Sequence, residues 1–354
     1  MTLIIAEAGV NHNGSKELAY KLVDAAKNAG ADIVKFQTFK AKNLASKEAH
    51  QAEYQVENTQ RKESQLAMLK RLELPYEFHH ELIKYCNDVG IEFLSTAFDS
   101  ESLAFLVNDL GLKKLKIPSG EITNAPLVLE HAQTGCNLIL STGMATLAEI
   151  EDVLGVIAFG YLGLTNPSFD AFREAYASAK GQELLKKKVT ILHCTTEYPA
   201  PMDEINLKAM DTLAHAFKLP VGYSDHSEGI TVPIAAVARG AIVIEKHFTL
   251  DKNMDGPDHK ASLEPGELKT MVSAIRNVEL ALGLGVKAPT ASEIKNKVVA
   301  RKSLVAATDI NKGEAFSRHN LAIKRPGAGI SPFYYWDTLG KISTESYKED
   351  EIIK

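Results

Sequence analysis

Short runs of apolar and β-branched residues alternate with amphipathic stretches along most of the chain. In the segment Glu17–Asn28 the apolar positions Leu18, Leu22 and Ala25 fall at helical spacing, and Gly30 follows where a glycine would end the helix. The same spacing predicts helices over Leu147–Ala158 and Leu268–Leu282. Eight apolar runs predict strands: Leu3–Ala6, Ile33–Phe36, Glu92–Ser95, Leu115–Ile117, Leu138–Leu140, Val189–Leu192, Val221–Tyr223 and Ile242–Glu245.

This alternation determines the expected fold class. Strands that alternate with helices form right-handed βαβ crossovers and a parallel sheet. Eight such units in about 285 residues predict an α/β fold of the (β/α)8 TIM-barrel type. A doubly wound open sheet is the alternative, but it usually carries a glycine-rich G-x-G-x-x-G loop after its first strand. The first strand here continues as EAGVNHNG over Glu7–Gly14, which does not match that pattern.

Two parts of the chain depart from the strand–helix rhythm. Gly160–Lys188 is longer than a simple connection, and its helical pattern over Phe169–Lys187 predicts an extra or extended helix before the sixth strand. After residue 285 the alternation of strand and helix patterns stops. This predicts a barrel over 1–285, a polar linker over 286–299 and a small domain over 300–354. A domain of about 55 residues is near the lower size limit for independent stability, so we expect it to pack against another protein surface.

Composition excludes several classes of protein. Of 354 residues, 45% are hydrophobic and 24% charged, with a net charge of −5, which fits a globular protein and lacks the basic footprint of nucleic-acid binding. No apolar stretch reaches the ~18 residues of a membrane span, and the N-terminus lacks the basic start of a signal peptide. Three cysteines, Cys86, Cys136 and Cys194, are too few for a disulfide framework. We therefore expect a cytoplasmic protein with no nucleic-acid or membrane partner.

Polar side chains follow every predicted strand. A barrel carries its catalytic groups at the C-terminal ends of its strands. Buried charge is costly unless it is paired, so a purely structural barrel would not need charged groups at these places. The strand ends supply Glu7, Lys35, Gln37, Ser95, Thr96, Lys116, Ser119, Glu121, Ser141, Thr142, His193, Thr195, Thr196, Tyr198, Ser224, Asp225, His226, Glu245, Lys246 and His247.

Two histidines are candidate metal ligands. His226 and His247 end the seventh and eighth predicted strands. Adjacent strands lie about 5 Å apart, so the two imidazoles can share one divalent ion. Two histidines completed by water or carboxylate suit Mn²⁺, Zn²⁺ or Fe²⁺. The alternative is a pair of histidines whose hydrogen bonds are satisfied within the fold.

Two lysines end apolar strands and have three interpretations. Lysine is seldom buried without an anionic partner, so Lys35 and Lys116 predict either ion pairs with Glu7 or Glu121 or an anionic substrate. Hydroxyl groups at the neighbouring ends favour a phosphate or carboxylate ligand. A Schiff-base lysine of an aldolase is the third interpretation. Glu7 and Glu121 are candidate acid/base groups or lysine counter-ions, and the sequence does not separate these roles.

The assembled motifs resemble those of the N-acetylneuraminate (sialic acid) synthase family, including its legionaminic acid synthase branch. The resemblance covers essentially the whole chain, and KIPSGEITN and HCTTEYPAP favour the legionaminate branch. ARKSLVA at Ala300–Ala306 and KRPGAGISP at Lys324–Pro332 are similar to the family's C-terminal antifreeze-like (SAF) domain. The barrel motifs are IIAEAGVNHNGS, VKFQTFKA, FLSTAFD, KIPSGEITN, STGMAT, HCTTEYPAP, GYSDHS, IEKHFTLD and GPDHKASLEP.

The resemblance implies a reaction and a set of roles. It implies that the protein condenses phosphoenolpyruvate with an N-acetylhexosamine to a nonulosonic acid and releases phosphate. It also implies a domain-swapped homodimer in which Arg325 reaches the sugar substrate bound to the other subunit. The implied metal is Mn²⁺, with Mg²⁺ or Co²⁺ as alternatives. Thr196 stands where some members have asparagine; its shorter hydroxyl can still donate to phosphate, so we expect it among the substrate-binding residues. Matched positions are phosphoenolpyruvate-binding Lys35, Thr96, Lys116, Ser119, Ser141 and Ser224; sugar-contacting Gln37, Tyr198, Asp258 and Arg325; metal-binding His226 and His247; and the active-site carboxylates Glu7 and Glu121.

Two rival functions follow from the same residues. A Schiff-base aldolase acting on a nonulosonic acid would use a lysine without metal or phosphoenolpyruvate. A non-enzymatic sugar-binding or structural dimer is the second rival, but it does not explain the polar residues at the strand ends. Within the family the acceptor stays open between N-acetylmannosamine, 2,4-diacetamido-2,4,6-trideoxymannose and a phosphate-bearing hexosamine.

Overall fold

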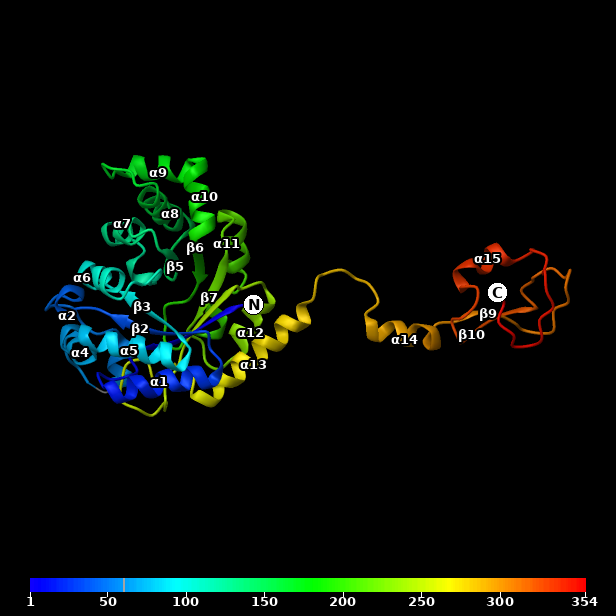
Figure 1. The fold of residues 1–354 in the computed structure, drawn as a ribbon, viewed down its shortest axis with the longest axis horizontal. Helices are drawn as coiled ribbons and strands as arrows, with labels where there is room; N and C mark the ends of the chain where they lie inside the picture. The colour runs from blue at the N-terminus through cyan, green and yellow to red at the C-terminus, as the bar shows by residue number, and fades with distance from the viewer. Residues whose placement is uncertain (60) are drawn as a thin grey trace. The chain divides into compact units, whose positions relative to one another are not determined.

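The computed structural model describes residues 1–59 and 61–354 and contains the expected barrel (Figure 1). Eight parallel strands pair in chain order and close between β1 and β8. The predicted (β/α)8 barrel is therefore confirmed, and each predicted strand overlaps an observed one. The strands are β1 (Leu3–Gly9), β2 (Ile33–Thr38), β3 (Glu92–Ala97), β4 (Lys114–Ile117), β5 (Asn137–Ser141), β6 (Val189–His193), β7 (Val221–Asp225) and β8 (Val243–His247).

Helices surround the strands, as expected for parallel crossovers (Figure 1). The first, α1, is capped by Ser15, which accepts from the Leu18 amide, and it ends at Gly30 with φ of 83°, as its sequence predicted. The helices of the barrel unit are α1 (Lys16–Ala29), α2 (Ala41–Leu44), α3 (Glu53–Thr59), α4 (Gln65–Leu72), α5 (Tyr76–Val89), α6 (Ser100–Ala104), η1 (Phe105–Asp109), η2 (Ser119–Glu121), α7 (Ala125–Gln133), α8 (Leu147–Tyr161), α9 (Phe169–Ala177), α10 (Ala179–Lys188), η3 (Met202–Glu204), α11 (Ala209–Phe217), α12 (Thr231–Ala238) and α13 (Pro265–Leu282).

The long connection before β6 holds two helices, α9 and α10, in place of one. Ser178 ends α9 and caps α10, where its hydroxyl accepts from the Gly181 amide. A cap residue needs extended backbone, and Ser178 has ψ of 142°, so the helical pattern is interrupted there. No helix of the described chain is long and apolar enough to span a membrane.

The chain divides into two compact units, Met1–Gly283 and Leu284–Lys354. Helix α14 (Ala291–Ala300) begins within the segment expected as a linker and ends one residue beyond it, and its start is fixed by a capping box between Thr290 and Glu293. The second unit pairs β9 (Ser303–Ala306) antiparallel to β10 (Leu321–Lys324), followed by η4 (Pro332–Tyr334) and α15 (Tyr335–Thr338). Its own core comprises Leu304, Ala306, Ile310, Phe316, Leu321, Tyr347 and Ile353.

An apolar layer fills the inside of the barrel on the N-terminal side of the site. It is a cluster separate from the larger core between strands and helices. Gly222 on β7 packs against this apolar layer. A Cβ at Gly222 would lie 2.5 Å from the Val243 carbonyl oxygen and 2.7 Å from the Leu192 side chain. Only glycine permits this close packing. The layer contains Ile5, Ile33, Leu94, Ile139, Leu192 and Val243.

Candidate functional site

A charged layer lies directly above the apolar layer inside the barrel. Side chains two residues apart on a strand share one face, so Glu7 follows Ile5, Lys35 follows Ile33, and Glu245 follows Val243. All of these groups are buried. The same spacing supplies Thr96, Ser141 and Cys194 to this layer, with Lys116 and Ser224 from β4 and β7.

Lys35 lies among three acceptors. Its Nζ is 2.6 Å from Glu7 Oε2 and 3.5 Å from Glu245 Oε2. It also donates to Thr96 Oγ1 at 3.0 Å. Burial alone would lower the pKa of Lys35, but Glu245 and Glu7 raise it, so Lys35 is a cation at neutral pH.

Lys116 occupies the other side of Glu245. Its Nζ lies 3.6 Å from Glu245 Oε1 and donates to Ser141 Oγ at 2.7 Å. Ser224 Oγ donates to the same Glu245 oxygen at 2.9 Å. Burial lowers the pKa of Lys116, since Glu245 compensates only in part.

The two carboxylates differ in protonation. Burial raises the pKa of Glu7 from 4.5 to about 7, although Lys35 opposes the change. Burial would also raise the pKa of Glu245, but Lys116 and Lys35 together lower it to about 2. Glu245 is therefore an anion between two lysines, and Glu7 can gain or lose a proton near neutral pH. With Glu7 protonated, two lysines face one carboxylate, and the layer has an excess positive charge that can attract an anion.

A cavity of about 250 Å³ opens above this layer. Of the site residues that the sequence predicts in the barrel unit, all but Glu121 line it. A tight backbone turn packs against two of the lining residues, since a Cβ at Gly143 would lie 2.3 Å from Thr196 Oγ1 and 2.9 Å from Ser119 Oγ. The Gly143 amide donates to Ser119 Oγ at 2.9 Å. The lining residues from the expected set are Glu7, Lys35, Gln37, Thr96, Lys116, Ser119, Ser141, Thr196, Tyr198, Ser224, His226, His247 and Asp258.

The two histidines lie side by side at the cavity. Their ring centroids are 5.7 Å apart, and the Tyr198 ring is 4.1 Å from that of His226. His226 Nδ1 lies 2.6 Å from the Thr195 carbonyl oxygen, to which it donates in the tautomer that satisfies both atoms. This tautomer leaves the lone pair on Nε2. His247 Nδ1 is buried and has no hydrogen-bond partner among the residues that the structure describes.

Both imidazoles are neutral, which is the form that binds metal. Burial lowers the pKa of His226 to about 4 and that of His247 well below its usual value. In the described part of the chain no three His, Cys, Asp or Glu side chains are arranged to hold a metal ion. A metal at this place would therefore have two imidazole ligands and take the rest from water or substrate, and the donor chemistry of His226 and His247 fits it.

With this geometry established, comparison with known proteins identifies the family. The pattern of the NeuB family matches residues 22–287. The chain belongs to the NeuB family. Residues 301–354 match the SAF domain. Both expected resemblances, to the barrel family and to its C-terminal domain, are thereby confirmed.

Several NeuB-family relatives are similar over most of their length. The N,N'-diacetyllegionaminic acid synthase of Campylobacter jejuni is 55% identical over 353 residues, covering 100% of this chain and 99% of that protein. The enzyme of the same name from Legionella pneumophila is 48% identical, covering 93% and 86%. A crystal structure of N-acetylneuraminic acid (sialic acid) synthetase from Leptospira borgpetersenii in complex with citrate superposes with a TM-score of 0.67 at 32% identity, covering 83% and 90%.

Of the expected NeuB site residues in the barrel unit, Glu121 lies outside the cavity lining. Glu121 ends the 3-10 turn η2, and its Oε2 accepts from Asn124 Nδ2 at 2.7 Å. Arg325 lies in the second unit, where it is exposed and its Nε donates to the Ala300 carbonyl oxygen at 3.1 Å. Of the two candidate carboxylates, Glu7 is therefore the one that the structure brings to the lysines and histidines.

Glu245 is the main site residue that the sequence reasoning missed. It was noted at the end of the eighth strand but assigned no role. The available signal was its position two residues before His247, which places both side chains on the same face of β8. Asp258 was expected, and burial raises its pKa to about 6.

Proposed function

We propose that this NeuB-family chain is a transferase that condenses phosphoenolpyruvate with an N-acetylated mannosamine-type sugar to a nonulosonic acid and releases phosphate. The observation that carries the proposal is the juxtaposition of two buried lysines with two neutral histidines in one cavity. The lysines and the hydroxyls beside them suit the carboxylate and phosphate of phosphoenolpyruvate. The names of the Campylobacter and Legionella relatives support N,N'-diacetyllegionaminic acid as the product.

The reaction balances without a redox partner. Carbon 3 of phosphoenolpyruvate forms a C–C bond to the aldehyde carbon of the open-chain sugar, and the aldehyde oxygen takes up a proton. Water adds to carbon 2 and loses a proton. The bond between carbon 2 and the bridging oxygen then breaks while the hydroxyl on carbon 2 gives its remaining proton to the departing phosphate, which leaves a ketone.

The residues of the cavity divide this work. Lys35 and Lys116 bind and orient the phosphoenolpyruvate anion. The pKa of about 7 supports Glu7 as the group that takes the proton of the attacking water. His226 and His247 would hold a divalent ion, for which we propose Mn²⁺, with Mg²⁺ or Co²⁺ as alternatives. Such an ion supplies Lewis-acid polarisation of a carbonyl oxygen.

The assembly and the compartment are part of the proposal. We infer a domain-swapped homodimer in which Arg325 contacts the sugar bound to the partner subunit, on the basis of the family resemblance. The three cysteines are free, which supports a reducing, cytoplasmic environment. Mixing an Arg325→Ala chain with a His247→Ala chain tests the swap, because one site of each mixed dimer keeps both residues and should regain activity that neither chain has alone. Unchanged inactivity in proven mixed dimers would contradict it.

The reaction is tested by measuring phosphate release. Purified chain with Mn²⁺ and phosphoenolpyruvate should release one phosphate per nonulosonic acid formed when either N-acetylmannosamine or 2,4-diacetamido-2,4,6-trideoxymannose is added, and none without a sugar. Borohydride treatment with pyruvate tests the aldolase alternative, since a Schiff base would be trapped on lysine. Trapping without phosphate release would overturn the proposal.

A further inference from the structure

One side of the cavity is apolar. Its residues come from three separate places, namely the turn after β1, helix α4 and the residue that follows β3. With Phe39 and Ala41 they belong to a hydrophobic cluster distinct from the main core of the barrel. We call these residues the apolar wall: Val10, Met68, Leu69, Leu72 and Phe98.

Two members of the apolar wall remain partly open to the cavity. Val10, Met68 and Leu72 are buried, whereas Leu69 and Phe98 are half-buried and line the cavity. The same cavity is also lined by Lys35, Lys116 and Glu245, which form ion pairs with one another. Apolar surface left open inside a binding cavity is favourable only when a ligand covers it.

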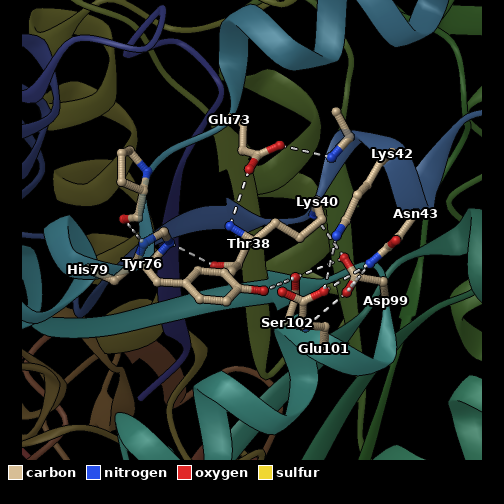
Figure 2. A network of polar contacts seen from close by, with 12 residues as sticks. Thr38, Lys40, Lys42, Asn43, Glu73, Tyr76, His79, Asp99, Glu101 and Ser102 are labelled. Carbon is tan, nitrogen blue, oxygen red and sulfur yellow. Dashed lines mark hydrogen bonds and ion pairs between the residues drawn. The ribbon is translucent and has the colours of Figure 1, made fainter.

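The apolar wall is held in place before any substrate arrives. Lys40 lies between the carboxylates of Glu73 and Asp99 (Figure 2). Its backbone amide donates to Asp99 Oδ2 at 2.9 Å, and its Nζ lies 3.3 Å from Glu73 Oε1. Glu73 directly follows Leu72, and Asp99 directly follows Phe98. Lys40 therefore ties the end of α4 to the end of β3 and fixes the two parts of the wall relative to each other.

Further hydrogen bonds fix the rest of α4 and residues that precede it in the chain. Ser64 caps the helix by accepting from the Ala67 amide at 3.2 Å. Gln51 Nε2 lies 3.4 Å from Met68 Sδ, and its Oε1 accepts from the Glu63 amide at 3.0 Å. A preformed wall of this kind discriminates between ligands because it cannot move away from an unsuitable group.

The candidate acceptors differ in the groups that such a surface would distinguish. N-acetylmannosamine carries hydroxyl groups at carbons 4 and 6. The 2,4-diacetamido-2,4,6-trideoxy sugar carries an acetamido group at carbon 4 and a methyl group at carbon 6. Methionine, leucine and phenylalanine side chains give a sugar hydroxyl no good hydrogen-bond partner, so a hydroxyl placed there loses its water without replacement. Methyl groups lose nothing and gain contact.

We infer that the apolar wall is the subsite for carbon 6, which is a methyl group in the trideoxy sugar, and for the methyl end of the acetamido group on carbon 4, and that Leu69 and Phe98 set the preference for this sugar. This inference rests on the proposed function. One methyl or methylene group in an apolar pocket changes kcat/KM by about 10- to 200-fold. With two such groups, the trideoxy sugar should exceed N-acetylmannosamine by more than about 100-fold.

The test compares kcat/KM for the two acceptors at saturating phosphoenolpyruvate and Mn²⁺. Leu69→Gln keeps a side chain that is unbranched at Cβ and has good helix propensity, but it adds an amide to the wall. It should lower the ratio between the two acceptors by about tenfold or more, with an unchanged KM for phosphoenolpyruvate. Leu69→Met should preserve the ratio. Leu66→Gln is the matched control, because Leu66 is half-buried on the same helix and does not line the cavity.

Each outcome decides a separate point. An equal loss with both acceptors in Leu69→Gln overturns the inference, because the wall would then contact the acetamido group that both sugars share. A changed oligomeric state with an intact ratio overturns it as well, because protein would cover the wall. A wild-type preference for N-acetylmannosamine also contradicts it while leaving the reaction intact. Absence of phosphate release with both sugars refutes the proposed function itself.

Discussion

Removing one partner of the Asp225–Lys246 ion pair should destabilise the barrel strongly. The two residues are register partners on β7 and β8, and Lys246 Nζ lies 2.7 Å from Asp225 Oδ2 with both side chains 0% exposed. Asp225 Oδ1 also accepts from the amide and hydroxyl of Ser227, at 2.9 and 2.7 Å. Lys246 Nζ makes its other hydrogen bond to the Ser227 carbonyl oxygen.

The magnitude follows from burial. Asp225→Asn leaves an ammonium group in the protein interior without a counter-charge, which costs about 3–5 kcal/mol. That is a large part of the ~5–15 kcal/mol by which domains are stable. Burial already lowers the pKa of Lys246, so in this variant the lysine can release its proton, and the cost should shrink as the pH rises. The double variant Asp225→Asn with Lys246→Met removes both charges and should be more stable than either single variant.

Urea denaturation of the full chain, followed by circular dichroism, measures these effects. The matched control is Glu183→Gln, which breaks the ion pair with Lys180 at 2.9 Å on the surface, where the side chains are 62% and 61% exposed. Its effect should stay below about 1 kcal/mol. The reasoning fails if Asp225→Asn costs no more than this control, or if the double variant loses the full sum of the two single losses.

Three further predictions concern the cavity. Burial raises the pKa of Glu7 from 4.5 in the unfolded chain to about 7, so ionising Glu7 reduces the stability of the fold as the pH rises through this range. The wild type should therefore lose about 3 kcal/mol between pH 4 and pH 8, and Glu7→Gln should remove this loss. Urea midpoints across this pH range measure it, and the same pH profile in the variant would contradict the prediction. Lys116→Ala should raise KM for phosphoenolpyruvate about 10- to 100-fold by loss of one charge-assisted hydrogen bond. Lys114→Ala should not, because Lys114 lies at the start of the same strand, where it pairs with Glu92 and does not line the cavity, and equal effects of both would refute the role. His247→Ala should abolish Mn²⁺ binding in a paramagnetic resonance titration and lower turnover at least 100-fold, and Mn²⁺ binding as tight as in the wild type would disprove ligation.

The fold was predictable because its signals are local. Each strand is a short apolar run, and each following helix carries its own periodicity and caps, as at Ser15 and Gly30. Parallel order and barrel closure then follow from the number of repeats. Site residues such as Lys35 and His247 were predictable for the same reason, because the end of a strand can be located without knowing its neighbours.

What the sequence did not provide depends on contacts between distant segments. Glu121 stands in the same motif as Lys116, yet a 3-10 turn directs it to Asn124 and not into the cavity lining. The apolar wall was not anticipated because Met68 and Leu69 fit equally well as ordinary core residues of a short amphipathic helix. Which apolar positions face a substrate depends on where α4 lies against β3, and the Lys40 contacts that fix this join residues over 30 positions apart.

Side chains along a strand point alternately to the two faces of the sheet, so adjacent residues of one strand can serve the stability of the barrel and the chemistry of the cavity. Lys246 and Asp225 each precede a histidine of the cavity, so the residues that face away from the barrel axis carry an ion pair while those that face the cavity carry the imidazoles. A one-residue slip of β8 against β7 would exchange the two sets, placing a lysine in the cavity and His247 among the helices. The buried ion pair makes that slip costly because it would separate Asp225 from Lys246. The pair thus holds in register the two strands on which the proposed metal site depends, although neither of its side chains lines the cavity.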